Sequence, residues 1–225
     1  MHDLVKTLLA RAGSTLSEKA VHNLNAAINY AETGRWLASN GFRPRIRVKQ
    51  DRELFDLIIK EVAEREVLYL EFGVFEGESI RYWASRLKHS KASLHGFDSF
   101  EGLPETWNMV MRKGHFSTSG RIPKIADRRV KFFKGWFDQT LPGYVAPPHQ
   151  ELVINMDADL YSSTIYVLTT LRQLVVSGTY IYFDEFADRA NELRAFAEFV
   201  DTTGMKFEML GANSKFSRVV FRRIG

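Results

Sequence analysis

The stretch Leu68-Tyr-Leu-Glu-Phe-Gly-Val-Phe-Glu-Gly-Glu-Ser-Ile80 predicts a buried strand, a glycine turn and the start of a helix. Residues 67–72 are mostly apolar, which is typical of a strand covered on both faces of a parallel sheet. Gly73 and Gly77 allow positive φ and a close approach of the backbone to a ligand. Backbone amides at the start of the following helix, near Glu78, point towards a negative group. The stretch is thus compatible with a nucleotide-like ligand and equally with a plain turn that needs glycine for steric reasons.

Strand and helix patterns alternate on both sides of this stretch. The expected strands are 67–72, 92–97, 130–134, 152–156 and 180–183, and the expected helices are 52–64, 78–87, 161–175 and 189–202. Strand–helix units in series predict a parallel sheet with helices on both faces. Two closing strands, 206–210 and 216–221, have no long helix between them and predict an antiparallel edge. The expected fold is α/β, a doubly wound, mostly parallel sheet of seven strands.

The N-terminal residues 1–50 lack this alternation and are interpreted as a helical extension. Residues 14–18 have the composition of a helix start. Residues 42–49 form a basic connector, for which a solvated loop or an edge strand is favoured over an anion site. The main domain is expected to span 51–225, with Asp51 as the cap of its first helix. Apolar positions on the extension favour a homo-oligomer, most simply a dimer.

Composition excludes several classes of function. The chain has 225 residues, of which 45% are hydrophobic, and it contains no cysteine, so disulfides, thiolate metal sites and cysteine nucleophiles are excluded. The net charge of +4 falls short of a nucleic-acid-binding signature. No apolar run approaches the ~18 residues of a membrane span, and the first residues do not resemble a secretory signal. We therefore expect a cytoplasmic protein with a small-molecule partner.

Polar residues follow the strands at the edge where α/β sheets bind ligands. Asp98 ends the second strand and is expected to accept hydrogen bonds from a ribose, or else to cap the next turn. Glu71 beside Gly73 suits a cationic ligand such as S-adenosylmethionine better than a pyrophosphate. The spacing between Gly73 and Gly77 also lacks the full dinucleotide fingerprint, which speaks against NAD. Trp136, after the third strand, is a candidate for stacking on adenine or for the core.

Four carboxylates follow the fourth and fifth strands, namely Asp157, Asp159, Asp184 and Glu185. Converging carboxylates repel one another, and oxygen ligands select a hard cation such as Mg²⁺. The preferred ligands are Asp157, Asp184 and Glu185, whereas Asp159 is expected to cap the helix that begins at Leu160. The alternative is a set of separate caps without a metal.

Residues 105–127 form a long stretch without periodicity between two strands. Such a loop inside a compact domain is more often a functional lid than a passive connection. His115 lies within it and is a candidate general base, because histidine titrates near neutrality. A solvated histidine is the simpler interpretation. No hydrolase nucleophile elbow and no Walker loop are present.

Together these motifs resemble the macrocin O-methyltransferase family of class I methyltransferases, which has a Rossmann-like sheet. The resemblance rests on Glu71-Phe-Gly-Val-Phe-Glu-Gly-Glu-Ser79, Phe97-Asp-Ser-Phe-Glu-Gly-Leu-Pro104, Gly135-Trp-Phe-Asp-Gln-Thr-Leu-Pro142 and Asp157-Ala-Asp-Leu-Tyr-Ser-Ser-Thr164. It implies a cofactor site for S-adenosylmethionine formed by Glu71, Gly73, Phe75, Gly77, Ser79, Asp98, Ser99, Gly135 and Trp136. It also implies Mg²⁺ at Asp157, Asp184 and Glu185. Ala158, in place of glycine, and Glu185, in place of a shorter residue, depart from the family pattern.

The expected function is Mg²⁺-assisted methylation of a hydroxyl on a natural product, either a sugar or an aromatic ring. Asp157 is the first candidate for the proton acceptor and His115 the second. Three alternatives remain at this point: an NAD-linked oxidoreductase, a non-catalytic S-adenosylmethionine-binding module, and an RNA methyltransferase. The modest charge and the missing aromatic platform speak against the last of these.

Overall fold

The computed structural model describes residues 3–108 and 110–225, which divide into two compact units with the boundary after Gly41. The first unit consists of two helices, α1 (Asp3–Gly13) and α2 (Glu18–Ser39). The Ser17 side chain caps α2 by accepting a hydrogen bond from the backbone N–H of Ala20 at 3.2 Å, as the helix-start composition of residues 14–18 predicts. None of the helices in the described ranges is long and apolar enough to cross a membrane.

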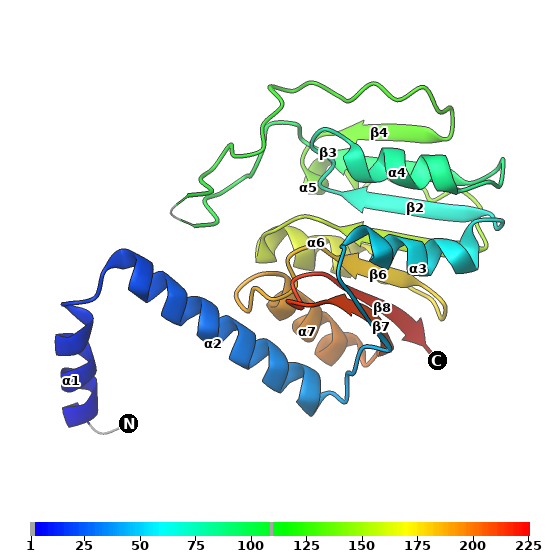
Figure 1. Cartoon of the computed structure of the whole chain (residues 1–225). Helices are drawn as coiled ribbons and strands as arrows, with labels where there is room; N and C mark the ends of the chain where they lie inside the picture. Colours follow the sequence, from blue (N-terminus) through cyan, green and yellow to red (C-terminus); the bar gives the residue numbers. More distant parts are fainter. Residues whose placement is uncertain (1–2, 109) are drawn as a thin grey trace. The chain divides into compact units, whose positions relative to one another are not determined.

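The second unit, from Phe42 onwards, is built on one eight-stranded sheet (Figure 1). Its strands are β1 (Ile46–Val48), β2 (Val67–Phe72), β3 (Ser93–Asp98), β4 (Val130–Lys134), β5 (Glu151–Met156), β6 (Tyr180–Phe183), β7 (Lys206–Asn213) and β8 (Val219–Ile224). They lie in the order β1-β7-β8-β6-β5-β2-β3-β4. β8 is antiparallel to both β6 and β7, and all other neighbours are parallel. The predicted α/β, mostly parallel sheet is confirmed, and its two closing strands are antiparallel to each other as predicted, but they do not form the sheet edge because β1 pairs with β7.

β1 is the strand that the expected count of seven omits. It pairs in parallel with β7 at the sheet edge, and only Val48 of its three residues is buried. Arg45, just before β1, binds the Glu208 carboxylate of β7. Arg47, within β1, donates to the carbonyl oxygen of Ser214, just after β7. The basic connector is therefore an edge strand, and the compact unit begins at Phe42, earlier than the domain start expected at residue 51.

Five helices cover the two faces of the sheet, namely α3 (Arg52–Val62), α4 (Glu78–Arg86), α5 (Phe137–Thr140), α6 (Tyr161–Leu171) and α7 (Glu192–Thr203). Because neighbouring side chains of a strand point to opposite faces, adjacent residues of β6 identify the two layers. Tyr182 packs against Phe55 of α3, with ring centroids 4.6 Å apart, and Phe183 packs against Phe196 of α7 at 5.1 Å. The sheet is therefore doubly wound, as predicted, and each buried Phe stabilises it by roughly 1.5–3 kcal/mol.

Of the two predicted aspartate caps, the position of Asp51 is confirmed and that of Asp159 is wrong. Asp51 occupies the N-cap position of α3, but its side chain makes no capping hydrogen bond and instead binds Asn213 and Arg218. Leu160, rather than Asp159, occupies the N-cap position of α6, and Asp159 has a left-handed φ of 59°. The first helical amide of α6, that of Tyr161, donates to the Asn191 side chain at 2.9 Å. Asp159 is therefore available to the cavity described next.

Candidate functional site

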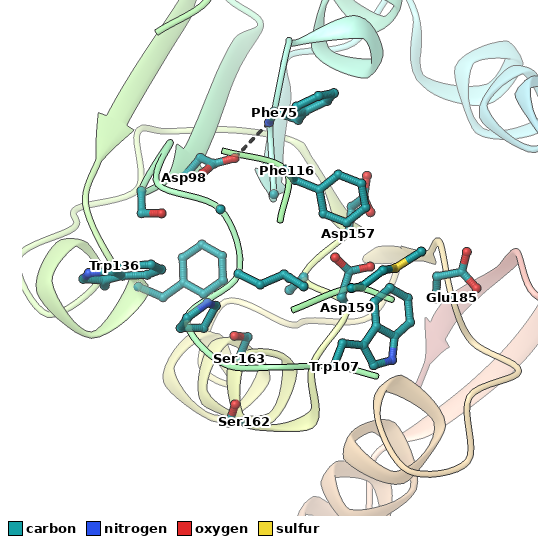
Figure 2. Close-up of a pocket in the computed structure, with 18 of the residues that line it drawn as sticks. Phe75, Asp98, Trp107, Phe116, Trp136, Asp157, Asp159, Ser162, Ser163 and Glu185 are labelled. Atoms are coloured by element: carbon teal, nitrogen blue, oxygen red, sulfur yellow. Dashed lines mark hydrogen bonds between the residues drawn. The ribbon is translucent and has the colours of Figure 1, made fainter. Parts of the chain in front are cut away.

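A cavity of about 800 Å³ lies at the carboxyl ends of the parallel strands (Figure 2). Its walls come from the turns after β2, β3, β4, β5 and β6, from α6, from the loop 105–127 and from the turn between β7 and β8. The lining residues used below are Gly73, Phe75, Asp98, Ser99, Trp107, Met111, Lys113, Phe116, Gly135, Trp136, Asp157, Asp159, Ser162, Ser163, Tyr166, Asp184, Glu185 and Arg218. This is the edge at which open α/β sheets bind their ligands.

The glycine turn after β2 forms one wall, and a close backbone contact explains its first glycine. Gly73 has φ of 91°, and a Cβ atom there would lie 1.9 Å from the carbonyl oxygen of Asp157. The Asp98 carboxylate closes the turn by accepting hydrogen bonds from the N–H groups of Val74 and Phe75, at 2.7 and 2.8 Å. Asp98 also accepts from the N–H of Phe100 at 2.6 Å, so it caps its own turn as well.

Six of the nine predicted cofactor residues line the cavity: Gly73, Phe75, Asp98, Ser99, Gly135 and Trp136. Gly77 and Ser79 do not belong to this lining. Gly77 instead precedes α4 with φ of 76°, which lets the chain turn into the helix.

Glu71 also lies outside the cavity lining. It shares a strand face with Tyr69 and is only 1% exposed. The Tyr69 hydroxyl donates a hydrogen bond of 2.5 Å to it. Burial raises the pKa of Glu71 to about 8, so its carboxyl is mostly neutral at pH 7. The predicted contact of Glu71 with a cationic ligand is therefore not part of this cavity.

The opposite wall is acidic and contains Asp157, Asp159, Asp184 and Glu185, which the topology brings together from the ends of β5 and β6. Burial, followed by repulsion from Glu185, raises the pKa of Asp159 to about 7. Burial and the neighbouring Asp184 raise the pKa of Glu185 to about 7 and that of Asp157 well above its usual value. Two carboxyl groups of this wall, those of Asp159 and Glu185, therefore have pKa values near neutral pH.

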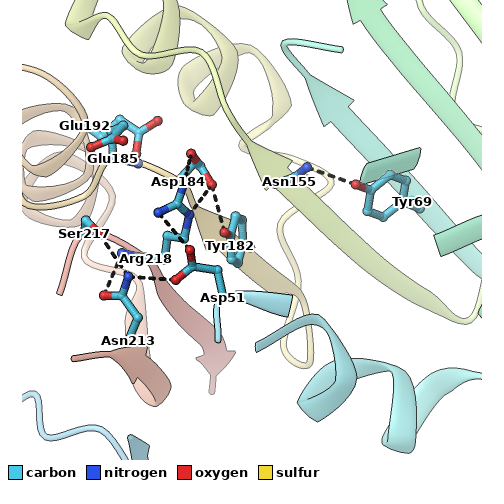
Figure 3. Close-up of polar contacts among 10 residues, drawn as sticks. All are labelled: Asp51, Tyr69, Asn155, Tyr182, Asp184, Glu185, Glu192, Asn213, Ser217 and Arg218. Carbon is cyan, nitrogen blue, oxygen red and sulfur yellow. Dashed lines mark hydrogen bonds and ion pairs between the residues drawn. The ribbon is translucent and has the colours of Figure 1, made fainter. Parts of the chain in front are cut away.

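Asp184 differs from the other three carboxylates because it is paired with a cation (Figure 3). Its Oδ1 accepts from Arg218 Nε at 2.8 Å and from the Tyr182 hydroxyl at 2.9 Å, and its Oδ2 accepts from Arg218 Nη2 at 3.1 Å. Asp157, Asp184 and Glu185, the predicted Mg²⁺ ligands, do share the cavity. However, Arg218 and Tyr182 already occupy both oxygens of Asp184. Among the residues that the structure describes, no three His, Cys, Asp or Glu side chains are arranged to hold a metal ion. The predicted metal set therefore does not fit in this arrangement.

The loop 105–127 covers the cavity and supplies Trp107, Met111, Lys113 and Phe116 to its lining. Two contacts fasten this loop: Trp107 Nε1 donates to Asp188 at 2.9 Å, and the Ser162 hydroxyl donates to Glu105 at 2.7 Å. The Phe116 ring also packs edge-on against Phe75 of the glycine turn, with centroids 5.8 Å apart.

His115, the second candidate for the general base, is exposed and does not line the cavity. Its ring packs on that of Phe116, with centroids 4.4 Å apart. Asp159, which the sequence analysis assigns to a helix cap, does line the cavity. Sequence reasoning missed four further lining residues, namely Ser162, Ser163, Tyr166 and Arg218. The first three belong to the quoted motif after β5 or its helix, whereas Arg218 lies in a region without any recognised motif.

Comparisons with known proteins agree with this geometry. Residues 41–215 match the family described as Macrocin-O-methyltransferase (TylF). A Streptomyces olivaceus 8-demethyl-8-(2,3-dimethoxy-alpha-L-rhamnosyl)-tetracenomycin-C 4'-O-methyltransferase is 30% identical over 138 residues, which cover 52% of this chain and 52% of the relative. A Streptomyces niveus demethyldecarbamoylnovobiocin O-methyltransferase is 37% identical over 127 residues, which cover 46% of this chain and 48% of the relative. The chain thus matches about half the length of these curated relatives.

Among solved structures, that of the O-methyltransferase NovP superposes with a TM-score of 0.60 and 22% identity, covering 78% of each chain. This likeness establishes the fold, which is that of class I methyltransferases preceded by N-terminal helices. The match to the family model spans most of the residues, including all strands from β1 to β7. The chain therefore belongs to the macrocin O-methyltransferase family.

Proposed function

We propose that this chain is an S-adenosylmethionine-dependent O-methyltransferase acting on a hydroxyl of a small natural product, in particular a hydroxyl of a sugar. The observation that carries this proposal is a single cavity with the glycine turn, Asp98 and Trp136 on one side and Asp157 and Asp159 on the other. Family membership supports the reaction class. The Streptomyces olivaceus relative, whose name places its methyl group on a rhamnosyl 4' oxygen, supports a sugar acceptor.

The glycine-turn side fits the cofactor. A cavity of about 800 Å³ is large enough for a cofactor together with a small acceptor. Trp136 offers an aromatic face for adenine, and Asp98 and Ser99 offer oxygen atoms for a ribose. When bound, S-adenosylmethionine supplies a methyl group already activated by its positive sulfonium. The protein must then mainly align the acceptor hydroxyl and exclude water.

The acidic side offers a proton acceptor. A general base works best when its pKa is near the operating pH. Asp159 lines the cavity, and its pKa of about 7 meets this condition. We therefore propose Asp159 as the acceptor of the hydroxyl proton. Asp157, which the sequence favours, lies on the same wall, where burial and the neighbouring Asp184 raise its pKa well above its usual value.

Mg²⁺ assistance was expected from the sequence, but the proposed reaction has no step that depends on it. Arg218 and Tyr182 occupy the oxygens of Asp184 that the metal would need.

We also propose that the chain forms a dimer through its first unit. Support comes from apolar residues of α1 and α2 that stay exposed, such as Leu4, Leu8 and Leu24.

Isothermal titration calorimetry tests the cofactor. We expect S-adenosylmethionine and S-adenosylhomocysteine to bind with micromolar dissociation constants and NAD⁺ not to bind. Asp98→Ala should weaken binding at least ten-fold, because it removes the carboxylate that holds the glycine turn. Asp201→Ala, an exposed change on α7, is the matched control. Failure of both S-adenosylmethionine and S-adenosylhomocysteine to bind would reject the proposal.

Methyl transfer tests the acceptor class. With methyl-labelled S-adenosylmethionine, a panel of methyl rhamnoside, a rhamnosylated polyketide and catechol separates sugar from aromatic hydroxyls. We expect label on the sugar compounds. Label on catechol alone would retain the methyltransferase and overturn the sugar acceptor. Tight cofactor binding without transfer to any panel member would favour a non-catalytic binding module.

A further inference from the structure

Arg218 is the cationic side chain that binds the acidic wall at the carboxyl end of β6. Its guanidinium lies between two carboxylates from distant parts of the chain (Figure 3). Nε and Nη2 bind Asp184 at 2.8 and 3.1 Å, and Nη1 binds Asp51 Oδ2 at 3.1 Å. Such a fork–carboxylate geometry is among the strongest hydrogen-bonded ion pairs in proteins. Arg218 also lines the cavity, so its charge acts where the ligand is expected to lie.

The surrounding residues hold this arginine in place. Asn213 donates through Nδ2 to Asp51 at 2.9 Å and to the Ser217 hydroxyl at 3.0 Å. The backbone N–H of Asn213 donates to the carbonyl oxygen of Arg218 at 2.9 Å. The turn between β7 and β8 is therefore tied to the start of α3, and the guanidinium is fixed before any ligand arrives.

A metal ion at Asp184 would have to share oxygens that already accept hydrogen bonds from Arg218 and Tyr182. With Arg218 and Tyr182 on Asp184, no oxygen of this carboxylate is free of a protein donor. A divalent ion would also come close to the fixed positive charge of the guanidinium. Repulsion between the two charges and the loss of an ion pair that is mostly shielded from water both act against metal binding.

We propose that Arg218 is the resident cation of the acidic wall and takes, at Asp184, the place that the sequence assigns to Mg²⁺. The site then holds no divalent metal, and Asp157, Asp159 and Glu185 remain available to bind protons and the acceptor. This inference concerns the cavity of the proposed function, but it is tested by metal binding, which can be measured whether or not the chain transfers a methyl group.

The experiment is a Mn²⁺ titration followed by the electron paramagnetic resonance signal of the free ion. We expect wild type to bind no Mn²⁺ specifically below millimolar concentration. Arg218→Met removes the charge, keeps much of the bulk and frees Asp184, so we expect at least ten-fold tighter Mn²⁺ binding. Arg218→Lys keeps a cation and should resemble wild type. Arg222→Met, four residues further on in β8 and outside the cavity lining, is the matched control and should not gain affinity.

A double variant and the melting temperature test the same metal binding independently. Adding Asp184→Asn to Arg218→Met should abolish the gained affinity, because it removes the freed carboxylate. Mn²⁺ should raise the melting temperature of Arg218→Met and leave that of wild type unchanged. Micromolar Mn²⁺ binding by wild type overturns the inference, even if Arg218→Met does not fold. Equal affinity of wild type and a folded Arg218→Met overturns it as well.

Discussion

At the residue scale, Asp159 combines a proposed role in proton transfer with a cost in stability. Its pKa is about 7 in the folded chain, against an ordinary value of 3.8. Between these values the unfolded chain binds fewer protons at this position, so the free energy of unfolding falls as pH rises from about 4 to 7. Each pKa unit corresponds to about 1.4 kcal/mol.

Asp159→Asn should therefore be more stable than wild type at pH 8, with a difference that shrinks towards pH 4. In the proposed reaction its turnover should fall at least about 100-fold, while the affinity for S-adenosylhomocysteine should stay within a few-fold. Urea unfolding at both pH values and single-turnover kinetics measure these effects, with Asp201→Asn as control. Equal stability changes at pH 4 and pH 8 would contradict the assignment of the raised pKa to Asp159.

Gly73 allows a second prediction at this scale. Gly73→Ala would place Cβ against the Asp157 carbonyl, whereas Gly114→Ala, at φ of 82°, would place it in open space. Both variants suffer left-handed strain of about 1–2 kcal/mol, but only the first adds a backbone clash. Gly73→Ala should destabilise the chain by at least about 2 kcal/mol more and abolish cofactor binding. Urea unfolding and calorimetry measure both effects, and equal destabilisation of the two variants would argue against the clash.

Site residues could be predicted from the sequence where a local pattern identifies them. Gly73 and Asp98 follow strands directly, so strand ends and glycines were enough to find them. Glu71 lies outside the cavity lining because alternation along β2 places its side chain on the same strand face as Tyr69, whose hydroxyl donates a hydrogen bond to it. Arg218 could not be found, because its role depends on a contact with Asp184 across the sheet rather than on any neighbouring residue.

At the element scale, β2, β4 and β6 were expected with the same bounds as they have in the structure. β2 and β6 are short, fully buried apolar runs, whereas β4 carries a lysine at positions 131 and 134 and has no buried residue. The strand β1 remained ambiguous, since only one of its three residues is buried. Its pairing with β7 depends on an edge that a local pattern cannot reveal.

The loop 105–127 permits a prediction at this scale. Trp107→Phe keeps an aromatic ring in the lining but removes the hydrogen bond to Asp188, a bond to a charged partner of about 1.5–3 kcal/mol. The loop should open more often, so limited trypsin digestion at Arg112 should accelerate several-fold and KM for the acceptor should rise. Cofactor affinity should change little. A digestion rate equal to that of wild type would show that this bond does not fasten the loop.

At the scale of the whole molecule, strand order decides which charges meet. Asp51, Asp184 and Arg218 are far apart in the chain and become neighbours because β8 lies between β6 and β7. The antiparallel pairing of β7 with β8 was predictable from the missing helix between these two strands. The side-chain network at the turn between β7 and β8 was not predictable, because it also includes Asp51 at the start of α3 and therefore depends on where that helix lies.

The first unit leads to the last prediction, on self-association. α1 has no buried residue, and Leu8 and Leu24 are 58% and 54% exposed. Leu4 and Leu9 of α1 are exposed as well, and several large exposed apolar side chains on one helix are characteristic of an interaction surface. We expect the chain to sediment as a dimer at micromolar concentration and the double variant Leu8→Glu with Leu24→Glu to sediment as a monomer, because the charges would be buried in the contact. Val145→Glu, a change at an equally apolar and even more exposed position of the second unit (85% exposed), should leave the dimer intact. A monomeric wild type, or a dimer unaffected by the double variant, would locate any self-association elsewhere and leave the leucines without this role.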